Sequence, residues 1–409
     1  MQTQLAEFIR NSPEGREAES ILRACMHCGF CLATCPTYQL LGDERDSPRG
    51  RIYLMKQVLE GQPVSARTQL HLDRCLTCRS CESTCPSGVR YGRLVDIGRQ
   101  VVEQKVRRKL GSRLFRGLLR HFLLSPRLFG FFLGAGRTFR PLLPAGLKAT
   151  VPPKVPPGAW PTRQQARRML LLEGCVQPAL APSINAATAR VLDRAGISLV
   201  RVRDAGCCGA VSQHLGAPQA ALQQIRRNID AWWPELEKGA EAIVITASGC
   251  GAMVKDYGHL LAHDPAYAEK ARRVAELARD ISEVVADCWP KLKPLLDQRR
   301  PPVETLAFHA PCTLQHGLKL KGGVERLLAD LGVRLAPVAD PHLCCGSAGT
   351  YSILQPELSQ RLRANKLAAL QAGRPQIILT ANIGCLTHLQ SATELPVRHW
   401  VELVDQVLN

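Results

Sequence analysis

The stretch CMHCGFCLATCP at residues 25–36 returns as CLTCRSCESTCP at residues 75–86, and both copies read Cys-x-x-Cys-x-x-Cys-x-x-x-Cys-Pro. Three thiolates separated by two residues each can wrap one small metal centre in a tight loop, whereas the fourth thiolate has to come from farther away. Two copies of this spacing in one chain are not a chance event. The repeated stretch therefore predicts two thiolate-bound metal sites within the first hundred residues.

The spacing is that of bacterial ferredoxins with two [4Fe-4S] clusters, in which the fourth cysteine of each run ligates the other cluster. On that rule one cluster is held by Cys25, Cys28, Cys31 and Cys85, and the other by Cys75, Cys78, Cys81 and Cys35. Zinc is disfavoured, because zinc sites usually combine two Cys-x-x-Cys pairs. Pro36 and Pro86 are expected to end their loops, since proline lacks a backbone donor and cannot continue a helix.

Around these runs, residues 1–100 are predicted to form an α-helical, ferredoxin-type two-cluster domain. Residues 1–24 indicate one short amphipathic helix, and a helix is predicted over Ile52–Leu59 after the turn at residues 46–51. Arg49 and Arg51 in that turn allow two interpretations. They are solvated surface charges, or they offset the negative charge of the clusters and adjust their reduction potentials.

The composition favours a folded, multidomain protein in a reducing compartment. A chain of 409 residues with 45% hydrophobic residues is long enough for two to four domains with cores of their own. The chain has 17 cysteines, but triplets of Cys-x-x-Cys type without an apolar signal-peptide core at the start indicate thiolates reserved for metal. We therefore expect a cytoplasmic location.

The formal charge of +18 is concentrated in one segment: 15 Lys or Arg residues and no Asp or Glu lie between Gln104 and Leu172. Within it, residues 101–165 form a basic connection rich in Leu and Phe. Its longest uncharged run, Leu128–Gly136, is far shorter than the ~20 residues of a spanning helix. The pattern predicts either an amphipathic hairpin lying on an anionic membrane surface or apolar residues that pack on the protein itself or on a partner subunit.

The remainder of the chain is an internal duplication, with cysteine-rich repeat 1 at residues 166–300 and repeat 2 at 301–409. Four cysteines of one copy match four of the other at offsets of 137, 137, 137 and 135 residues. The first set is Cys175, Cys207, Cys208 and Cys250, and the second is Cys312, Cys344, Cys345 and Cys385.

Both repeats alternate strands and helices, which predicts a parallel sheet with right-handed crossovers in each. In repeat 1 we expect strands at 169–172, 198–202 and 242–246 and helices at 182–195 and near 220–232. In repeat 2 we expect strands at 305–308, 333–338 and 376–380 and helices at 324–331 and near 357–370. The fold class is thus α/β and α+β multidomain, and every repeat cysteine falls just past the carboxyl end of a strand, where such sheets place their ligands.

The vicinal pairs Cys207-Cys208 and Cys344-Cys345 are each followed by glycine, which favours soft-metal ligation or redox chemistry over packing. The eight repeat cysteines are therefore candidates for an additional metal or redox site, either a further iron-sulfur cluster or zinc. His309 has Leu172 as its counterpart in repeat 1, so we expect it to be structural or to support a ligand. Cys288 has no partner in the duplication and is expected to be an ordinary buried cysteine.

Two ferredoxin runs followed by two Cys-Cys-Gly repeats resemble the iron-sulfur subunits of heterodisulfide reductase, of the anaerobic glycerol-3-phosphate dehydrogenase and, most closely, of glycolate oxidase. The resemblance covers nearly the whole chain. It implies a subunit that carries electrons from a flavoprotein dehydrogenase partner, which oxidises glycolate to glyoxylate, and that lies peripherally on the cytoplasmic face of the inner membrane. Relatives of heterodisulfide reductase type end each repeat in Cys-x-x-Cys, whereas Ala247 and Asn382 occupy the first position here.

The leading functional prediction is accordingly an electron-transfer subunit of a membrane-associated 2-hydroxy-acid dehydrogenase, with no catalytic residue and no flavin on this chain, since no G-x-G-x-x-G follows a strand. The equivalent subunit of a lactate or glycerol-3-phosphate dehydrogenase, or a heterodisulfide-reductase-like subunit with its own active cluster, is the alternative. A nucleic-acid-binding iron-sulfur protein is a remote alternative. No nucleic acid is expected as a partner, because Phe and Leu dominate the basic segment and no recognition motif accompanies its charge.

Overall fold

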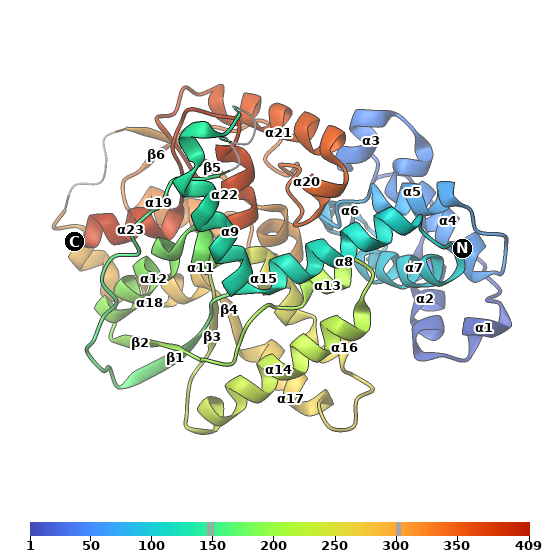
Figure 1. Cartoon of the computed structure of the whole chain (residues 1–409), viewed down its shortest axis with the longest axis horizontal. Coiled ribbons are helices and arrows are strands. Elements are labelled where there is room, and N and C mark those ends of the chain that lie inside the picture. The colour runs from blue at the N-terminus through green and yellow to red at the C-terminus, as the bar shows by residue number, and fades with distance from the viewer. Residues whose placement is uncertain (145–147, 149–150, 300–303) are drawn as a thin grey trace. The chain divides into compact units, whose positions relative to one another are not determined.

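The computed structural model describes residues 1–144, 148, 151–299 and 304–409 (Figure 1). It divides into two compact units. The first contains Met1–Gly117 together with His342–Lys366, and the second contains Leu118–Pro341 and Leu367–Asn409. A segment of repeat 2 therefore belongs to the same unit as the two ferredoxin-type runs.

The N-terminal part of the first unit is helical, drawn in blue to cyan in Figure 1. Its elements are α1 (Glu7–Arg10), α2 (Pro13–Ala24), α3 (Pro36–Leu41), η1 (Glu44–Asp46), α4 (Pro48–Leu59), α5 (Ala66–Asp73), α6 (Ser80–Thr84) and α7 (Tyr91–Lys105). Apolar side chains of α2, α4, α5 and α7 form its core, and Leu22, Met55, Leu59 and Leu94 are fully buried there. The core supports the two cysteine runs, which lie in the loops between these helices.

Two local expectations need correction. Residues 1–24 form two helices instead of one, because the Ser12 hydroxyl accepts a hydrogen bond from the Gly15 amide and caps a new helix whose first residue is Pro13. Pro36 does not simply end its loop: it is the first residue of α3. The fixed backbone angle of proline suits a first helical turn, whose N–H groups have no partner within the helix.

In the basic connection, where a helical hairpin is one prediction, the structure has two helices, α8 (Leu110–Leu124) and α9 (Pro126–Thr138), separated by Ser125 and followed by η2 (Arg140–Leu142). Neither helix has a buried residue. Large apolar side chains remain exposed along both: Leu110, Leu114, Phe115, Leu118, Phe131 and Phe132. Among the described residues, every helix is too short or too polar to traverse a bilayer.

Each repeat builds a four-stranded parallel sheet, as predicted. The first sheet has the order β2-β1-β3-β4, with β1 (Arg167–Leu172), β2 (Ile197–Arg201), β3 (Ile243–Ile245) and β4 (Ala278–Asp280). The second has the order β6-β5-β7-β8, with β5 (Thr305–His309), β6 (Arg334–Leu335), β7 (Ile377–Thr380) and β8 (Val397–His399). The last strand of each sheet was not predicted, and β6 is shorter than the predicted 333–338.

Helices connect these strands. In repeat 1 they are α11 (Gln177–Leu180), α12 (Pro182–Arg194), α13 (Ala210–His214), α14 (Pro218–Glu237), α15 (Ser248–Lys255), α16 (Tyr257–Leu260), α17 (Ala268–Leu277) and α18 (Ile281–Leu296). In repeat 2 they are η3 (Thr313–Gly317), α19 (Gly323–Asp330), α20 (Tyr351–Leu354), α21 (Pro356–Gln371), α22 (Ile383–Gln390) and α23 (Trp400–Leu408). Within the second unit, apolar residues of both repeats share one core, and Arg190 of α12 pairs with Asp405 of α23 at 2.5 Å.

Candidate metal centres

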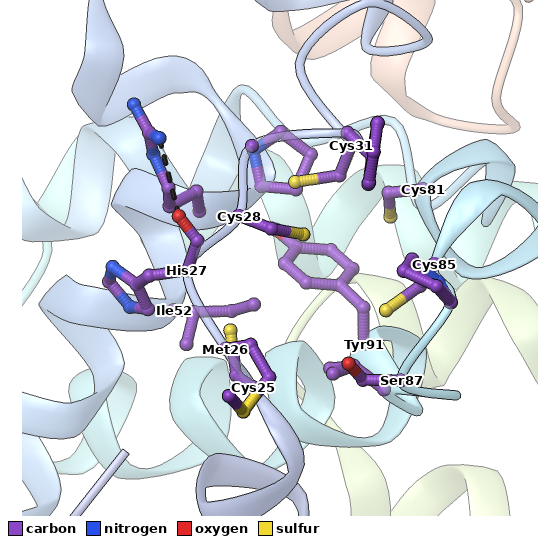
Figure 2. Close-up of a pocket in the computed structure, with 16 residues that line it drawn as sticks. Cys25, Met26, His27, Cys28, Cys31, Ile52, Cys81, Cys85, Ser87 and Tyr91 are labelled. Atoms are coloured by element: carbon purple, nitrogen blue, oxygen red, sulfur yellow. Dashed lines mark hydrogen bonds between the residues drawn. The ribbon is translucent and has the colours of Figure 1, made fainter.

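The first ferredoxin-type site is a cavity whose lining includes Cys25, Cys28, Cys31 and Cys85, the four predicted ligands, and also Cys81. Cys25 follows the end of α2, Cys28 and Cys31 lie in the loop after it, and Cys85 follows the last residue of α6. These cysteines are arranged around the ring of Tyr91 (Figure 2). The cavity contains about 430 Å³ of empty space, including space open to solvent, and Cys28 is exposed at its edge.

The second site is a cavity of about 310 Å³ of empty space, again including solvent, lined by Cys35, Cys75, Cys78 and Cys81. Cys35 directly precedes α3, Cys75 follows α5, and Cys81 lies within α6. Cys35, Cys75 and Cys81 are buried, so the predicted ligands of this site are less exposed than those of the first, where Cys28 is exposed. Each cavity thus contains three cysteines of one run together with the fourth cysteine of the other run, as the predicted exchange requires, and Cys81 lines both cavities. Which cysteines bind each cluster stays a prediction.

The donor atoms suit a thiolate-bound cluster. Left-handed backbone at His27, Gly29, Thr77 and Arg79 turns both loops tightly, with φ values of 53°, 88°, 55° and 58°. In the second loop the Thr77 amide donates a hydrogen bond to the Cys75 sulfur at 3.4 Å, and the Tyr91 hydroxyl donates to the same sulfur at 3.6 Å. Hydrogen bonds to sulfur are a feature of Fe–S sites that influences their potential.

The thiols of the two sites differ in their electrostatic surroundings. Burial raises the pKa of Cys31 to about 11 and also raises the pKa values of Cys25 and Cys81. Burial acts in the same sense on Cys75, but the guanidinium groups of Arg51 and Arg99 outweigh it and lower the pKa of that thiol. Cys75 is therefore favoured as a thiolate, the form that binds metal.

Arg49 and Arg51 lie in the first turn of α4, because the helix begins at Pro48 and the predicted turn at residues 46–51 is wrong from that residue onward. Arg49 lines the first cavity, donates to the His27 carbonyl at 3.4 Å and pairs with Glu44 at 2.8 Å, with its side chain 32% exposed. Arg51 is 1% exposed and lines the second cavity. Both arginines thus lie beside a cluster site, but Arg49 is partly solvated and Arg51 is buried.

In repeat 1 the structure brings the four predicted cysteines together. The Cys207 sulfur accepts hydrogen bonds from the thiols of Cys175 and Cys208, and Cys208 is also hydrogen-bonded to Cys250. These bonds lower the pKa of Cys207 and, together with burial, raise the pKa values of Cys175 and Cys208. Four soft donors converging in this way could hold one iron-sulfur cluster or one zinc ion.

Two polar side chains that the sequence analysis missed fix the Cys-Cys-Gly loop of repeat 1. The Asn228 amide donates to the Cys207 carbonyl at 2.9 Å and accepts from the Gly206 amide at 2.8 Å. The Tyr257 hydroxyl donates to the Cys208 carbonyl at 2.8 Å. Asn228 and Tyr257 lie 19 and 48 residues beyond Gly209, on α14 and α16, and no local pattern marks them.

In repeat 2 the corresponding cysteines fall into the two units. Cys344 and Cys345 belong to the unit of the ferredoxin-type runs, and Cys312 and Cys385 belong to the other. All four are buried. The Cys-Cys-Gly loop keeps the local geometry of repeat 1: the Gly346 amide donates to the Cys344 sulfur at 3.4 Å, as the Gly209 amide does to Cys207 at 3.5 Å. Gly346 has a φ of 88°, and a Cβ there would lie 2.6 Å from the Ser359 carbonyl oxygen, so only glycine fits.

Comparison with known proteins agrees with this division. The 4Fe-4S dicluster domain family matches residues 21–89, and the cysteine-rich domain family matches residues 169–255 and 306–390. The glycolate oxidase iron-sulfur subunit of Escherichia coli (strain K12) is 56% identical over 410 residues, which cover 100% of both chains. The chain belongs to the glycolate oxidase iron-sulfur subunit family. It contains a two-cluster 4Fe-4S domain and two cysteine-rich domains.

Within the glycolate oxidase iron-sulfur subunit family, the probable member from Bacillus subtilis (strain 168) is 31% identical, with 94% of this chain and 92% of the relative covered. Lactate utilization protein A of Bacillus licheniformis is more distant, at 25% identity over 53% of this chain and 87% of its own. The family relationship makes this chain a component of an oxidoreductase complex.

The two positions without the additional cysteine have other roles in this family member. Ala247 is buried in the shared core. Asn382 caps α22 by accepting from the Gly384 amide at 3.0 Å, and its amide group lies 3.4 Å from the hydroxyls of Ser248 and Thr313. Ser248 and Thr313 are themselves hydrogen-bonded at 2.8 Å. These positions therefore join the two repeats, and only four cysteines per repeat remain.

Proposed function

We propose that this chain is the electron-transfer subunit of a flavin-dependent 2-hydroxy-acid dehydrogenase, with glycolate as the substrate of the complex. The observation that carries the proposal is the pair of cavities, each lined by at least four cysteines drawn from both runs. Its support from relatives is the full-length similarity to glycolate oxidase iron-sulfur subunits. The more distant lactate utilization proteins make lactate the second candidate substrate.

The ligands that we propose follow the two cavities. Cys25, Cys28, Cys31 and Cys85 hold one [4Fe-4S] cluster, and Cys75, Cys78, Cys81 and Cys35 hold the other. Such clusters accept and release single electrons. The described residues then have three tasks: the cysteines bind, the loop amides and Tyr91 orient the sulfur atoms, and the core of α2, α4, α5 and α7 shields the second site from water.

Substrate oxidation is proposed to take place on a partner flavoprotein. Removal of a hydride from a hydroxy acid needs an acceptor of two electrons, such as a flavin. The thiolate sites of this chain suit one-electron steps, so their function is to carry electrons onward to the quinone pool or the respiratory chain. The four thiols of repeat 1, and by duplication those of repeat 2, are proposed to hold a further iron-sulfur cluster or a zinc ion.

The test is reduction of the clusters by substrate. The chain is purified anaerobically, alone and with the flavoprotein that co-purifies with it, and the electron paramagnetic resonance (EPR) spectrum is recorded after addition of glycolate, L-lactate or glycerol 3-phosphate. We expect signals of two reduced clusters with glycolate, and only when the flavoprotein is present. Reduction by lactate or glycerol 3-phosphate in preference to glycolate would move the assignment to that dehydrogenase, and a chain without two clusters would refute the proposal.

A further inference from the structure

The cysteines of the second ferredoxin-type site are more buried than those of the first, and burial by itself makes a cluster harder to reduce. Addition of an electron increases the negative charge of a thiolate-bound cluster, and burial disfavours the more highly charged form. A positive charge nearby acts in the opposite sense. The groups that surround Cys35, Cys75, Cys78 and Cys81 therefore determine whether this site accepts an electron as readily as the exposed one.

Arg51 supplies such a charge. Its guanidinium lines the second cavity and donates to Asp46 at 3.1 Å, to the Thr37 hydroxyl at 3.0 Å and to the His71 carbonyl at 2.7 Å. The Thr37 hydroxyl in turn lies 3.4 Å from the Cys35 sulfur. The guanidinium is thus linked to a proposed ligand through a single hydroxyl group.

Asp46 does not neutralise the charge of Arg51 completely, because its carboxylate is shared between two arginines. Its other oxygen binds Arg74 at 2.9 Å, so two guanidinium groups lie against one fully buried carboxylate. Arg99 adds a third cation, which donates to the Cys75 carbonyl at 2.6 Å. At the first site, Arg49 lines the cavity but pairs with Glu44 at 2.8 Å, and its side chain is 32% exposed, so solvent screens its charge.

We propose that Arg51 is the counter-charge that keeps the enclosed cluster reducible, by raising its reduction potential relative to the value that burial alone would impose. The inference rests on the proposed function only in requiring that a cluster is bound at each site. It assigns to Arg51 a positioning and tuning role, and it separates Arg51 from its sequence neighbour Arg49.

The test is an EPR-monitored redox titration of the anaerobic full chain with chemical mediators. Arg51→Gln is expected to lower the reduction potential of the second cluster by at least 59 mV. For a one-electron step this shift corresponds to a tenfold change in the equilibrium constant. Arg51→Lys should restore part of the shift. Arg49→Gln is the matched control and should leave the second cluster unchanged.

Asp46→Asn provides a test with the opposite sign. It removes the buried negative charge and keeps Arg51, so the potential of the second cluster should rise. A general loosening of the site would not shift the potential in opposite directions in Arg51→Gln and Asp46→Asn. An unchanged potential in Arg51→Gln, or an equal fall in Arg49→Gln, would overturn the inference. If the Arg51→Gln protein does not fold with both clusters, the Asp46→Asn protein decides: a second-cluster potential that does not rise in that variant overturns the inference. Chemical titration needs neither glycolate nor the flavoprotein, so its failure is distinct from failure of the proposed function.

Discussion

Replacement of Cys35 by serine is expected to eliminate the cluster of the opposite run, the one on Cys75, Cys78 and Cys81, and to preserve the cluster of its own run. Cys35 is buried and lines the second cavity, and the start of α3 at Pro36 fixes its backbone there. A cluster left with three thiolates lacks its fourth ligand, and we expect it to be lost. Iron and acid-labile sulfide of the anaerobic chain should fall by the content of one cluster.

The identity of the lost cluster can be read from paired variants. Cys35→Ser and Cys78→Ser should leave the same residual EPR spectrum, and Cys85→Ser and Cys28→Ser should leave the other. Cys35→Ala excludes ligation by the serine oxygen. Cys288→Ser changes a buried cysteine of the α18 core and should retain both signals. A residual spectrum shared by Cys35→Ser and Cys28→Ser would show that each run binds its own cluster.

The cysteine positions were predictable because metal chemistry restricts their spacing closely. The same holds for the strands β1, β3, β5 and β7, whose buried apolar runs are continuous. The strands β4 and β8 escaped prediction for a physical reason: each has three residues, includes an arginine and leads directly into a helix, as in Ala278-Arg279-Asp280. Edge strands of this length carry no periodic pattern that distinguishes them from a helix cap.

The surroundings of the sites were much less predictable than their ligands. Arginine is almost never fully buried without a partner, so sequence alone left Arg51 and Arg49 equivalent. The burial of Arg51 depends on Asp46 and on the carbonyl of His71, which is 20 residues away in the chain. Asn228 presents the same difficulty, since tertiary contacts place it and it belongs to no recognisable motif.

Serine substitutions in the exposed apolar side chains of the helical hairpin are expected to release the complex from membranes. Leu114, Leu118, Phe131 and Phe132 are 58%, 68%, 70% and 54% exposed, and arginines lie among them. The basic residues attract an anionic surface, and the apolar side chains can enter the boundary of the acyl chains. At about 1 kcal/mol for each partly inserted side chain, well below full burial, the fourfold variant should bind at least roughly hundredfold more weakly.

The measurement is co-sedimentation with vesicles of mixed neutral and anionic lipid. Binding of the unaltered complex should decrease as salt is raised, because ions screen the arginines over about 10 Å at 0.1 M. The double variant Arg113→Gln, Arg120→Gln should bind vesicles more weakly and with less dependence on salt. The fourfold serine variant should keep its dependence on salt, because its arginines remain, and lose the apolar contribution to binding.

Leu70→Ser with Leu295→Ser, which changes exposed leucines elsewhere, is the control. If the fourfold variant sediments as before, the hairpin is not the membrane contact and a partner subunit anchors the complex. Retention on DNA at low salt would instead support nucleic acid as the partner of the basic segment.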